Sequence, residues 1–199
     1  MRKRKNAELR KPEILEHFYQ VIIQEGIEGA SMAKIAESMN IHTSLIFHYF
    51  KSKENMLVEL AEYIQQKYDP PHVRELISAI KDPERRFNVF LDTLFSEVDI
   101  NTVNSSVYYA FYYLSYRNPK IHKLFVHMFK KHRDWIIREL EIFMREGIIK
   151  KVDLEMAADF IVSIFEGLSF HSDFLAGDKP FNLFGQYAKK LTKDFLKAS

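Results

Sequence analysis

The sequence predicts an all-α fold of about nine or ten helices, and three observations support this prediction. Apolar residues recur three and four positions apart along nearly the whole chain, which is the spacing of one helix face. No segment shows a convincing two-residue alternation of the kind that marks a strand. Glycine and proline number only six each among 199 residues, which argues against turn-rich β architectures.

Capping residues and prolines divide the chain into separate helices. Pro12 suits the first turn of a helix, which we expect to end at Gly26 and Gly29. The further helices are expected over residues 32–39, 43–50, 53–68, 72–81, 83–98, 102–117, 119–147, 153–175 and 181–198. The expected caps are Ser31, Ser52 and Asp153 at helix starts, and Gly147 and Gly177 at helix ends.

Composition excludes several classes of protein. A hydrophobic fraction of 47% is too high for a disordered chain. Cysteine is absent, so no disulfide, thiolate zinc site, iron–sulfur cluster or thiol nucleophile is possible. The longest uncharged stretch, residues 100–116, is short and polar for a membrane span, and no signal peptide precedes it. We therefore expect a cytoplasmic protein with no membrane partner.

The net charge of +2 conceals an asymmetry between the two ends of the chain. Residues 1–53 carry nine basic and six acidic side chains, whereas residues 54–199 carry 20 basic and 21 acidic side chains. Basic charge gathered at one end suggests a polyanionic partner there. A solubilising tail is the alternative interpretation.

Residues 31–50 have the dimensions of a helix-turn-helix, two short helices joined by a tight turn. A helix of eight residues is unstable alone, so it must be packed against a scaffold. Such a scaffold can hold the second helix in the major groove of DNA, which is about 12 Å wide, with its N-terminal residues facing base edges.

Residues 31–57 resemble the DNA-binding domain of the TetR/AcrR family of bacterial transcriptional regulators. The similarity is greatest at residues 48–57, which read HYFKSKENML. It covers about residues 10–60, and the remainder matches in architecture only. The resemblance implies a helix-turn-helix DNA-binding domain over residues 1–53. It also implies a helical effector-binding and dimerisation domain over residues 54–199.

The resemblance also implies roles for individual residues. Thr43 and Ser44 would face base edges with Leu45 beside them, replacing the lysine and glycine common at the first two positions. Backbone contacts are implied at Phe47, His48 and Tyr49, and phosphate contacts at Ser31 and Lys53. Phe47 stands where a tyrosine is usual, and it has no hydroxyl to donate. Tyr49 as a packing residue and His48 as a solvated one are the alternatives. The missing positive charge would come from Arg2, Lys3, Arg4 and Lys5.

The larger domain is rich in aromatic residues, with a broad tyrosine face over residues 108–116. Because buried tyrosine hydroxyls need partners, such a face fits a pocket better than a plain core. The expected pool of effector-lining residues is Phe87, Phe90, Leu91, Leu94, Tyr108, Phe111, Tyr112, Phe125, Phe129 and Phe165. For each member, simple packing in the core is the alternative.

Two long helices suit a subunit interface. The segment over residues 153–175 is apolar almost all round, and a helix apolar on every face must be buried on every face. We expect it to form a four-helix homodimer interface with residues 119–147, as the resemblance also implies. A fully internal helix is the alternative.

No catalytic motif is found in the sequence. His122, His127 and His132 are five apart, which scatters them around a helix, and no phosphate loop or nucleophile motif is present. We expect no enzyme activity, no cofactor and no metal. The prediction is a ligand-responsive dimeric repressor that binds double-stranded palindromic DNA and is released by a small apolar or aromatic effector. An activator of the same fold and a helical protein-interaction module without DNA binding are the alternatives.

Overall fold

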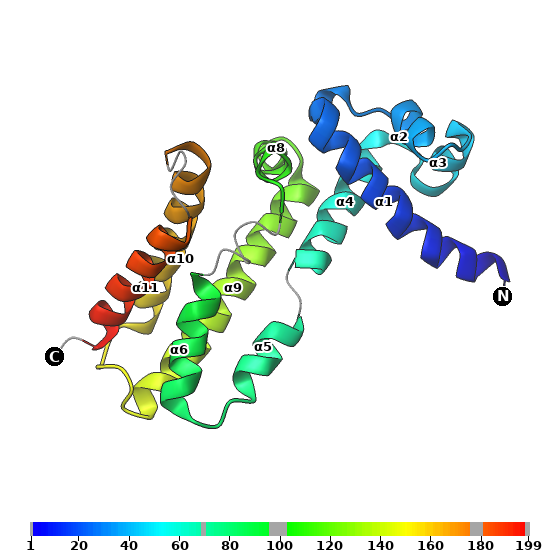
Figure 1. Cartoon of the computed structure of the whole chain (residues 1–199). Helices are drawn as coiled ribbons and strands as arrows, with labels where there is room; N and C mark the ends of the chain where they lie inside the picture. Colours follow the sequence, from blue (N-terminus) through cyan, green and yellow to red (C-terminus); the bar gives the residue numbers. More distant parts are fainter. Residues whose placement is uncertain (1, 69–70, 96–102, 176–180, 198–199) are drawn as a thin grey trace. The chain divides into compact units, whose positions relative to one another are not determined.

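A computed structural model describes the backbone of residues 2–68, 71–95, 103–175 and 181–197, and the side chains of residues 10–66, 73–95, 103–175 and 183–197. Within these ranges the chain forms ten helices and no strand, which confirms the all-α prediction. The helices (Figure 1) are α1 (Arg2–Gly29), α2 (Met32–Ser38), α3 (Thr43–Phe50), α4 (Lys53–Tyr68), α5 (Pro71–Ser78), α6 (Pro83–Leu94), α8 (Ser105–Ser115), α9 (Pro119–Arg145), α10 (Leu154–Phe174) and α11 (Phe181–Lys197).

The helices group into two compact units. Unit 1 contains α1 to α4, α8 and residues 119–127 of α9, and unit 2 contains α5, α6, the rest of α9, α10 and α11. This grouping concerns packing. The functional boundary expected after residue 53 stays a prediction.

The expected start of α1 is wrong, because the helix begins at Arg2 and Pro12 lies inside it. Residues 2–11 carry no apolar stripe, so periodicity does not mark them, but they are mostly good helix formers. The expected end is confirmed at Gly26, which has φ 72° and ψ 168°. Only glycine adopts this conformation without strain, so the regular helix breaks there.

The helix-turn-helix forms as expected. Ser31 caps α2, its Oγ accepting a hydrogen bond from the Lys34 backbone N–H at 3.2 Å. A turn follows, in which Asn40 has φ 51°. The α3 helix spans residues 43–50, and Ser52 caps α4 by accepting from the Asn55 N–H at 3.1 Å.

Unit 1 has one hydrophobic core, to which all its helices contribute. Ile35, Ala36, Ile46 and Phe50, expected in the core of the small domain, are buried, and Ile41 is half-buried. The core continues into α1, α4 and α8 through Ile14, Phe18, Ile22, Met56, Leu60, Val107 and Phe111. The helix-turn-helix and α8 therefore belong to one packed body.

Unit 2 has its own core, crossed by a buried ion pair. Phe87, Phe90, Leu140 and Phe143 are fully buried there. The Arg86 guanidinium on α6 donates to both carboxylate oxygens of Glu139 on α9, at 2.8 and 2.7 Å. Because the Glu139 side chain is only 5% exposed, this pair joins α6 to α9 away from water.

The expected caps of α9 and α10 are confirmed. Gly147 has φ 71°, its N–H bonds to the Met144 carbonyl at 3.2 Å, and the Ile148 N–H bonds to the Phe143 carbonyl at 2.8 Å, which together make a Schellman end. Asp153 accepts the N–H groups of Glu155 and Met156 at the start of α10. Gly177 lies outside the described residues.

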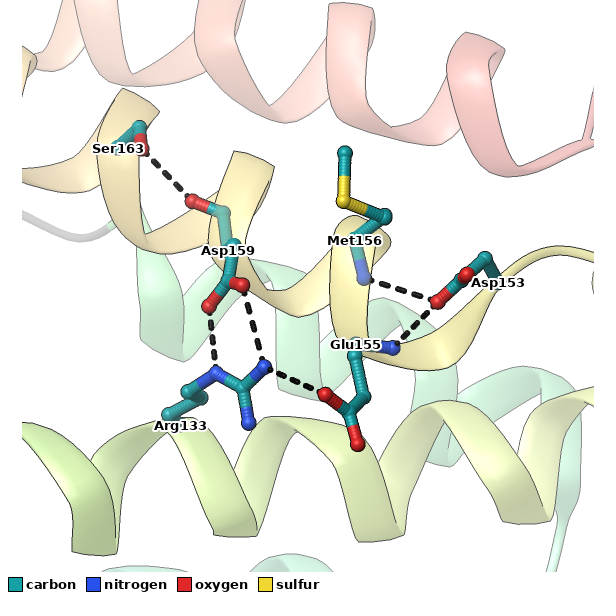
Figure 2. Close-up of polar contacts among 6 residues, drawn as sticks. All are labelled: Arg133, Asp153, Glu155, Met156, Asp159 and Ser163. Atoms are coloured by element: carbon teal, nitrogen blue, oxygen red, sulfur yellow. Dashed lines mark hydrogen bonds and ion pairs between the residues drawn. The ribbon is translucent and has the colours of Figure 1, made fainter.

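An exposed ion-pair cluster joins α9 to the first half of α10 (Figure 2). The Arg133 guanidinium donates to Asp159 at 2.5 and 3.1 Å and to Glu155 at 3.3 Å. This hydrogen bonding holds the pKa of the Asp159 carboxyl below its usual value. Met156 lies on the opposite side of α10 from Arg133 and is exposed, so one face of α10 packs on α9 while another remains open.

Within the part of the chain that the structure describes, no helix is both long and apolar enough to cross a membrane.

The Schellman end of α9 yields a stability prediction. We expect Gly147→Ala to lower the free energy of unfolding by about 1 kcal/mol, because an alanine Cβ opposes positive φ, although no atom lies within 4 Å of it. Gly147→Asn should cost less, since asparagine tolerates this conformation. Urea unfolding measures both, and equal losses would contradict a conformational origin.

Candidate nucleic-acid interface and effector region

The α3 helix has a buried face and an exposed face. Ile46 and Phe50 are fully buried against the rest of unit 1. Ser44, Phe47 and His48 are exposed. The helix is therefore fixed from one side, and its other side is free to contact a surface from outside.

The exposed face of α3 carries no lysine or arginine and is partly apolar. Thr43 and Leu45 are half-buried at its N-terminal end, and Phe47 is 50% exposed. The hydroxyls of Thr43 and Ser44 can donate and accept, while methyl and ring surfaces suit the thymine methyl group in a major groove. His48 and Tyr49 make an edge-to-face ring contact at 5.4 Å.

Three other residues predicted near DNA have partners inside the chain. The Lys53 ammonium donates to the backbone carbonyls of Ile27 and Glu28, at 2.7 and 3.4 Å. Ser31 acts as the cap of α2, and Tyr49 packs partly against the core of unit 1. Their roles at DNA stay predictions. The side chains of Arg2, Lys3, Arg4 and Lys5 lie outside the described residues, although their backbone begins α1.

Sequence reasoning missed the contacts that fix α4 to α1 and, through Lys11, to α3. Lys11 of α1 pairs with Glu59 of α4 at 2.7 Å, and its ammonium also lies 5.3 Å from the ring centroid of Phe50 in α3. The Tyr63 hydroxyl of α4 donates to Glu16 of α1 at 2.8 Å. No local pattern signals contacts between residues about 50 positions apart.

The residues expected to line an effector pocket divide between the two units. Phe87, Phe90, Leu91 and Leu94 are buried in the core of unit 2, and Phe111 is buried in the core of unit 1. These positions match the packing alternative. Their role toward an effector stays a prediction.

The tyrosines of α8 are more open. Tyr112 is 43% exposed, and its hydroxyl lies 3.0 Å from that of Tyr116. Tyr108 and Tyr112 both lie against Phe125 of α9, with their ring centroids 6.1 and 6.3 Å from the Phe125 centroid. This aromatic cluster lies within unit 1, whereas Phe129 and Phe165 belong to unit 2.

Trp135, which was not among the expected effector residues, lies in an aromatic cluster of unit 2. Its ring is 5% exposed and contacts Phe90 and His132, at centroid distances of 5.1 and 5.8 Å. The Arg74 guanidinium of α5 lies 5.4 Å from the ring centroid. Among the described residues, the buried indole Nε1 has no hydrogen-bond partner.

Helices α10 and α11 pack together (Figure 1). Exposed large apolar side chains on both helices give this pair an uncovered apolar surface. We call this surface the α10/α11 face. Its exposed members are Met156, Phe160, Phe170, Phe174, Leu175, Leu183, Tyr187, Leu191 and Phe195. An exposed apolar surface of this extent is typical of a protein interface.

The all-α chain has a helix-turn-helix in one unit and a separate aromatic core in the other, and matches to family models identify it as a DNA-binding transcriptional regulator with a ligand-binding domain. Residues 14–60 match the family model of bacterial regulatory proteins of the tetR family, and residues 83–193 match that of the tetracyclin repressor-like C-terminal domain. The chain belongs to the TetR family. Its members are transcription factors rather than enzymes, and they bind DNA, dimerise and bind small-molecule effectors.

Similar curated proteins include the HTH-type transcriptional regulator BetI. The Proteus mirabilis protein is 24% identical over 189 residues, covering 94% of this chain and 90% of that protein. The Burkholderia cenocepacia protein is 23% identical over 117 residues, so the match spans 59% of this chain and 60% of that protein.

Solved structures show the same fold. A TetR transcription regulator from Haloarcula marismortui has a TM-score of 0.81 at 18% identity, covering 94% of this chain and 98% of that one. A transcriptional regulator from Saccharomonospora viridis, solved in complex with choline, has a TM-score of 0.75 at 18% identity, with coverages of 94% and 95%.

The Lys53 contacts yield a second stability prediction. We expect Lys53→Met to lower the free energy of unfolding by about 1 kcal/mol, since the Ile27 carbonyl loses its charged donor. Lys51→Met, which removes an exposed charge two residues earlier, should change it by less than about 0.5 kcal/mol. Thermal or urea unfolding distinguishes the two, and equal effects would mean that the Lys53 contacts contribute nothing.

Proposed function

We propose that the chain is a ligand-responsive homodimeric repressor that binds a palindromic operator and is released by a small apolar or aromatic effector. The observation that carries the proposal is the geometry of α3. Buried Ile46 and Phe50 anchor this helix, while Ser44, Phe47 and His48 stand exposed on its other side. A helix held in this way can present its N-terminal residues to base edges.

The proposed contacts follow the order of residues along α3. Thr43, Ser44 and Leu45 read bases, while Phe47 and His48 lie against the sugar-phosphate backbone. Because the exposed side chains of this helix carry little positive charge, most of the affinity must come from basic residues elsewhere. Lys53, Arg2, Lys3, Arg4 and Lys5 are the proposed phosphate contacts, with Ser31 and Tyr49 beside them.

The proposed dimer interface is the α10/α11 face. We expected residues 119–147 to pair with residues 153–175, but Trp135, Ile136 and Phe143 of α9 are buried inside unit 2. The exposed apolar residues of unit 2 lie mainly on α10 and α11, which favours α11 as the second interface helix. A two-fold axis through this face would place α3, the proposed recognition helix, of each subunit at one of two half-sites. The half-sites would lie about 34 Å or a multiple of that distance apart.

Release by an effector follows from linkage. A small molecule that binds one conformation of the chain better than another shifts the population toward that conformation. If DNA binds the other conformation better, the affinity for DNA falls as the small molecule binds. Helix α4 is fixed to α1 by Lys11–Glu59 and Tyr63–Glu16, so a displacement of α4 would carry the recognition helix with it.

Selection of genomic DNA fragments by the purified full chain tests this function. Binding to an inverted repeat, with an affinity that falls steeply as salt rises, is expected. Transcription from the selected promoter should fall when the chain is present. A rise would favour an activator, and no binding to any genomic fragment would favour a protein-interaction module.

Base reading by Thr43 can be tested on the selected operator. We expect Thr43→Ala to change preference at one or two base positions, with a loss of about tenfold confined to the preferred bases. Lys53→Ala should instead weaken all sequences about equally and reduce the salt dependence. Fluorescence anisotropy with a set of single-base operator variants measures both. A sequence-independent effect of Thr43→Ala would contradict its role.

The α10/α11 face can be tested by introducing a charge. Leu191→Glu should weaken dimerisation by about 100-fold or more, because a carboxylate would be buried without a partner. Leu76→Glu alters an equally exposed leucine on α5 and should leave the dimer intact. Analytical ultracentrifugation over a concentration series gives both constants. A dimer insensitive to Leu191→Glu would place the interface elsewhere.

A further inference from the structure

We propose that Trp135 anchors the effector site and that the effector is a small apolar organic anion whose carboxylate accepts the indole N–H. This inference rests on the proposed function, because it names the class of ligand to which the regulator responds. It depends on one buried donor, the cluster of rings that includes it and the Arg74 guanidinium over its ring, all within unit 2.

The buried indole N–H is the first observation. Trp135 is more than nine-tenths buried, and its Nε1 has no hydrogen-bond partner among the described residues. An indole nitrogen can only donate, so an acceptor is the one group that satisfies it. Buried polar groups are nearly always paired, and an exception needs a cause. A ligand that supplies the acceptor is such a cause.

The surrounding side chains define the rest of the ligand. Phe90 of α6 and His132 of α9 contact the indole ring, and His132 in turn lies 5.7 Å from Phe165 of α10. Three helices thus contribute rings to one cluster that includes the indole of Trp135. Ligand sites commonly have mainly apolar walls and a few polar groups that fix orientation, so the body of the ligand should be apolar.

The Arg74 guanidinium over the Trp135 ring indicates the sign of the ligand charge. A quaternary ammonium binds proteins best over the face of a tryptophan ring. Here the Arg74 guanidinium already lies over Trp135, 5.4 Å from its centroid. A second cation on this ring would be repelled, whereas an anion would be attracted to both the guanidinium and the N–H. This chain should therefore differ from the Saccharomonospora viridis neighbour, which holds choline.

The chain contains a single tryptophan, so its intrinsic fluorescence reports this site directly. The purified full chain is titrated at pH 7.4 with octanoate, octan-1-ol and octyltrimethylammonium, which share an apolar chain and differ in the head group. 3-Phenylpropanoate and choline extend the series. We expect a saturable change of Trp135 emission with an anion, at least tenfold weaker binding of octanol, and no binding of either ammonium compound.

Two variants test the assigned groups. Trp135→Phe keeps a ring but removes the donor, so calorimetry should show octanoate affinity reduced about tenfold or more. Arg74→Gln should weaken octanoate but not octanol, and it retains Trp135 as the reporter if Trp135→Phe does not fold. Tyr113→Phe removes an exposed hydroxyl in unit 1 and serves as the matched control, with affinity unchanged.

Each outcome bears on the proposal. Tighter binding of octyltrimethylammonium or choline than of octanoate overturns the assigned charge. Absence of a saturable signal from both anions, or full affinity in Trp135→Phe, overturns the site. Operator binding by the unaltered chain is measured in parallel. If it persists while the anions fail, only this inference fails. If operator binding itself is absent, the proposed function fails.

Discussion

Helix α3 cannot hold its own conformation, and unit 1 is organised around this constraint. A helix of eight residues is far below the length at which isolated helices become stable in water. The α3 helix therefore depends on the burial of Ile46 and Phe50 among residues of the other helices of unit 1. Lys11 lies over the Phe50 ring while pairing with Glu59, so the anchor of α3 is also the junction with α4.

Features set by neighbouring residues were predictable from the sequence, and those set by distant residues were not. The caps at Ser31, Ser52, Asp153 and Gly147 depend on residues within three or four positions, and all four were found. The contact of Lys53 with Ile27 joins positions 26 apart and has no local signal.

Helices α10 and α11 also show what the sequence pattern cannot predict. Sequence marks α10 as apolar almost all round, and the structure confirms that one part of it, including Ala158 and Ile161, is buried. Another part, including Phe160 and Phe170, is exposed. Periodicity reports that a residue is apolar but not which partner covers it, so the exposed stripe of α11 escaped notice. For the same reason periodicity could not separate packing from ligand binding at Phe87, Phe90, Leu91, Leu94 and Phe111, whose role toward an effector stays a prediction.

Helix α9 gives the proposed effector site a physical connection to the DNA-binding helices. Its residues 119–127 belong to unit 1, and Trp135 lies seven residues, or about 10 Å, beyond residue 128, where unit 2 resumes. Gln65 of α4 donates to the Leu124 carbonyl of α9 at 3.2 Å. In the proposed site, a ligand held by Trp135 would lie on the same helix whose residue Leu124 contacts α4. Since linkage is reciprocal, a coupling of about 1–3 kcal/mol would weaken operator binding and ligand binding by the same factor.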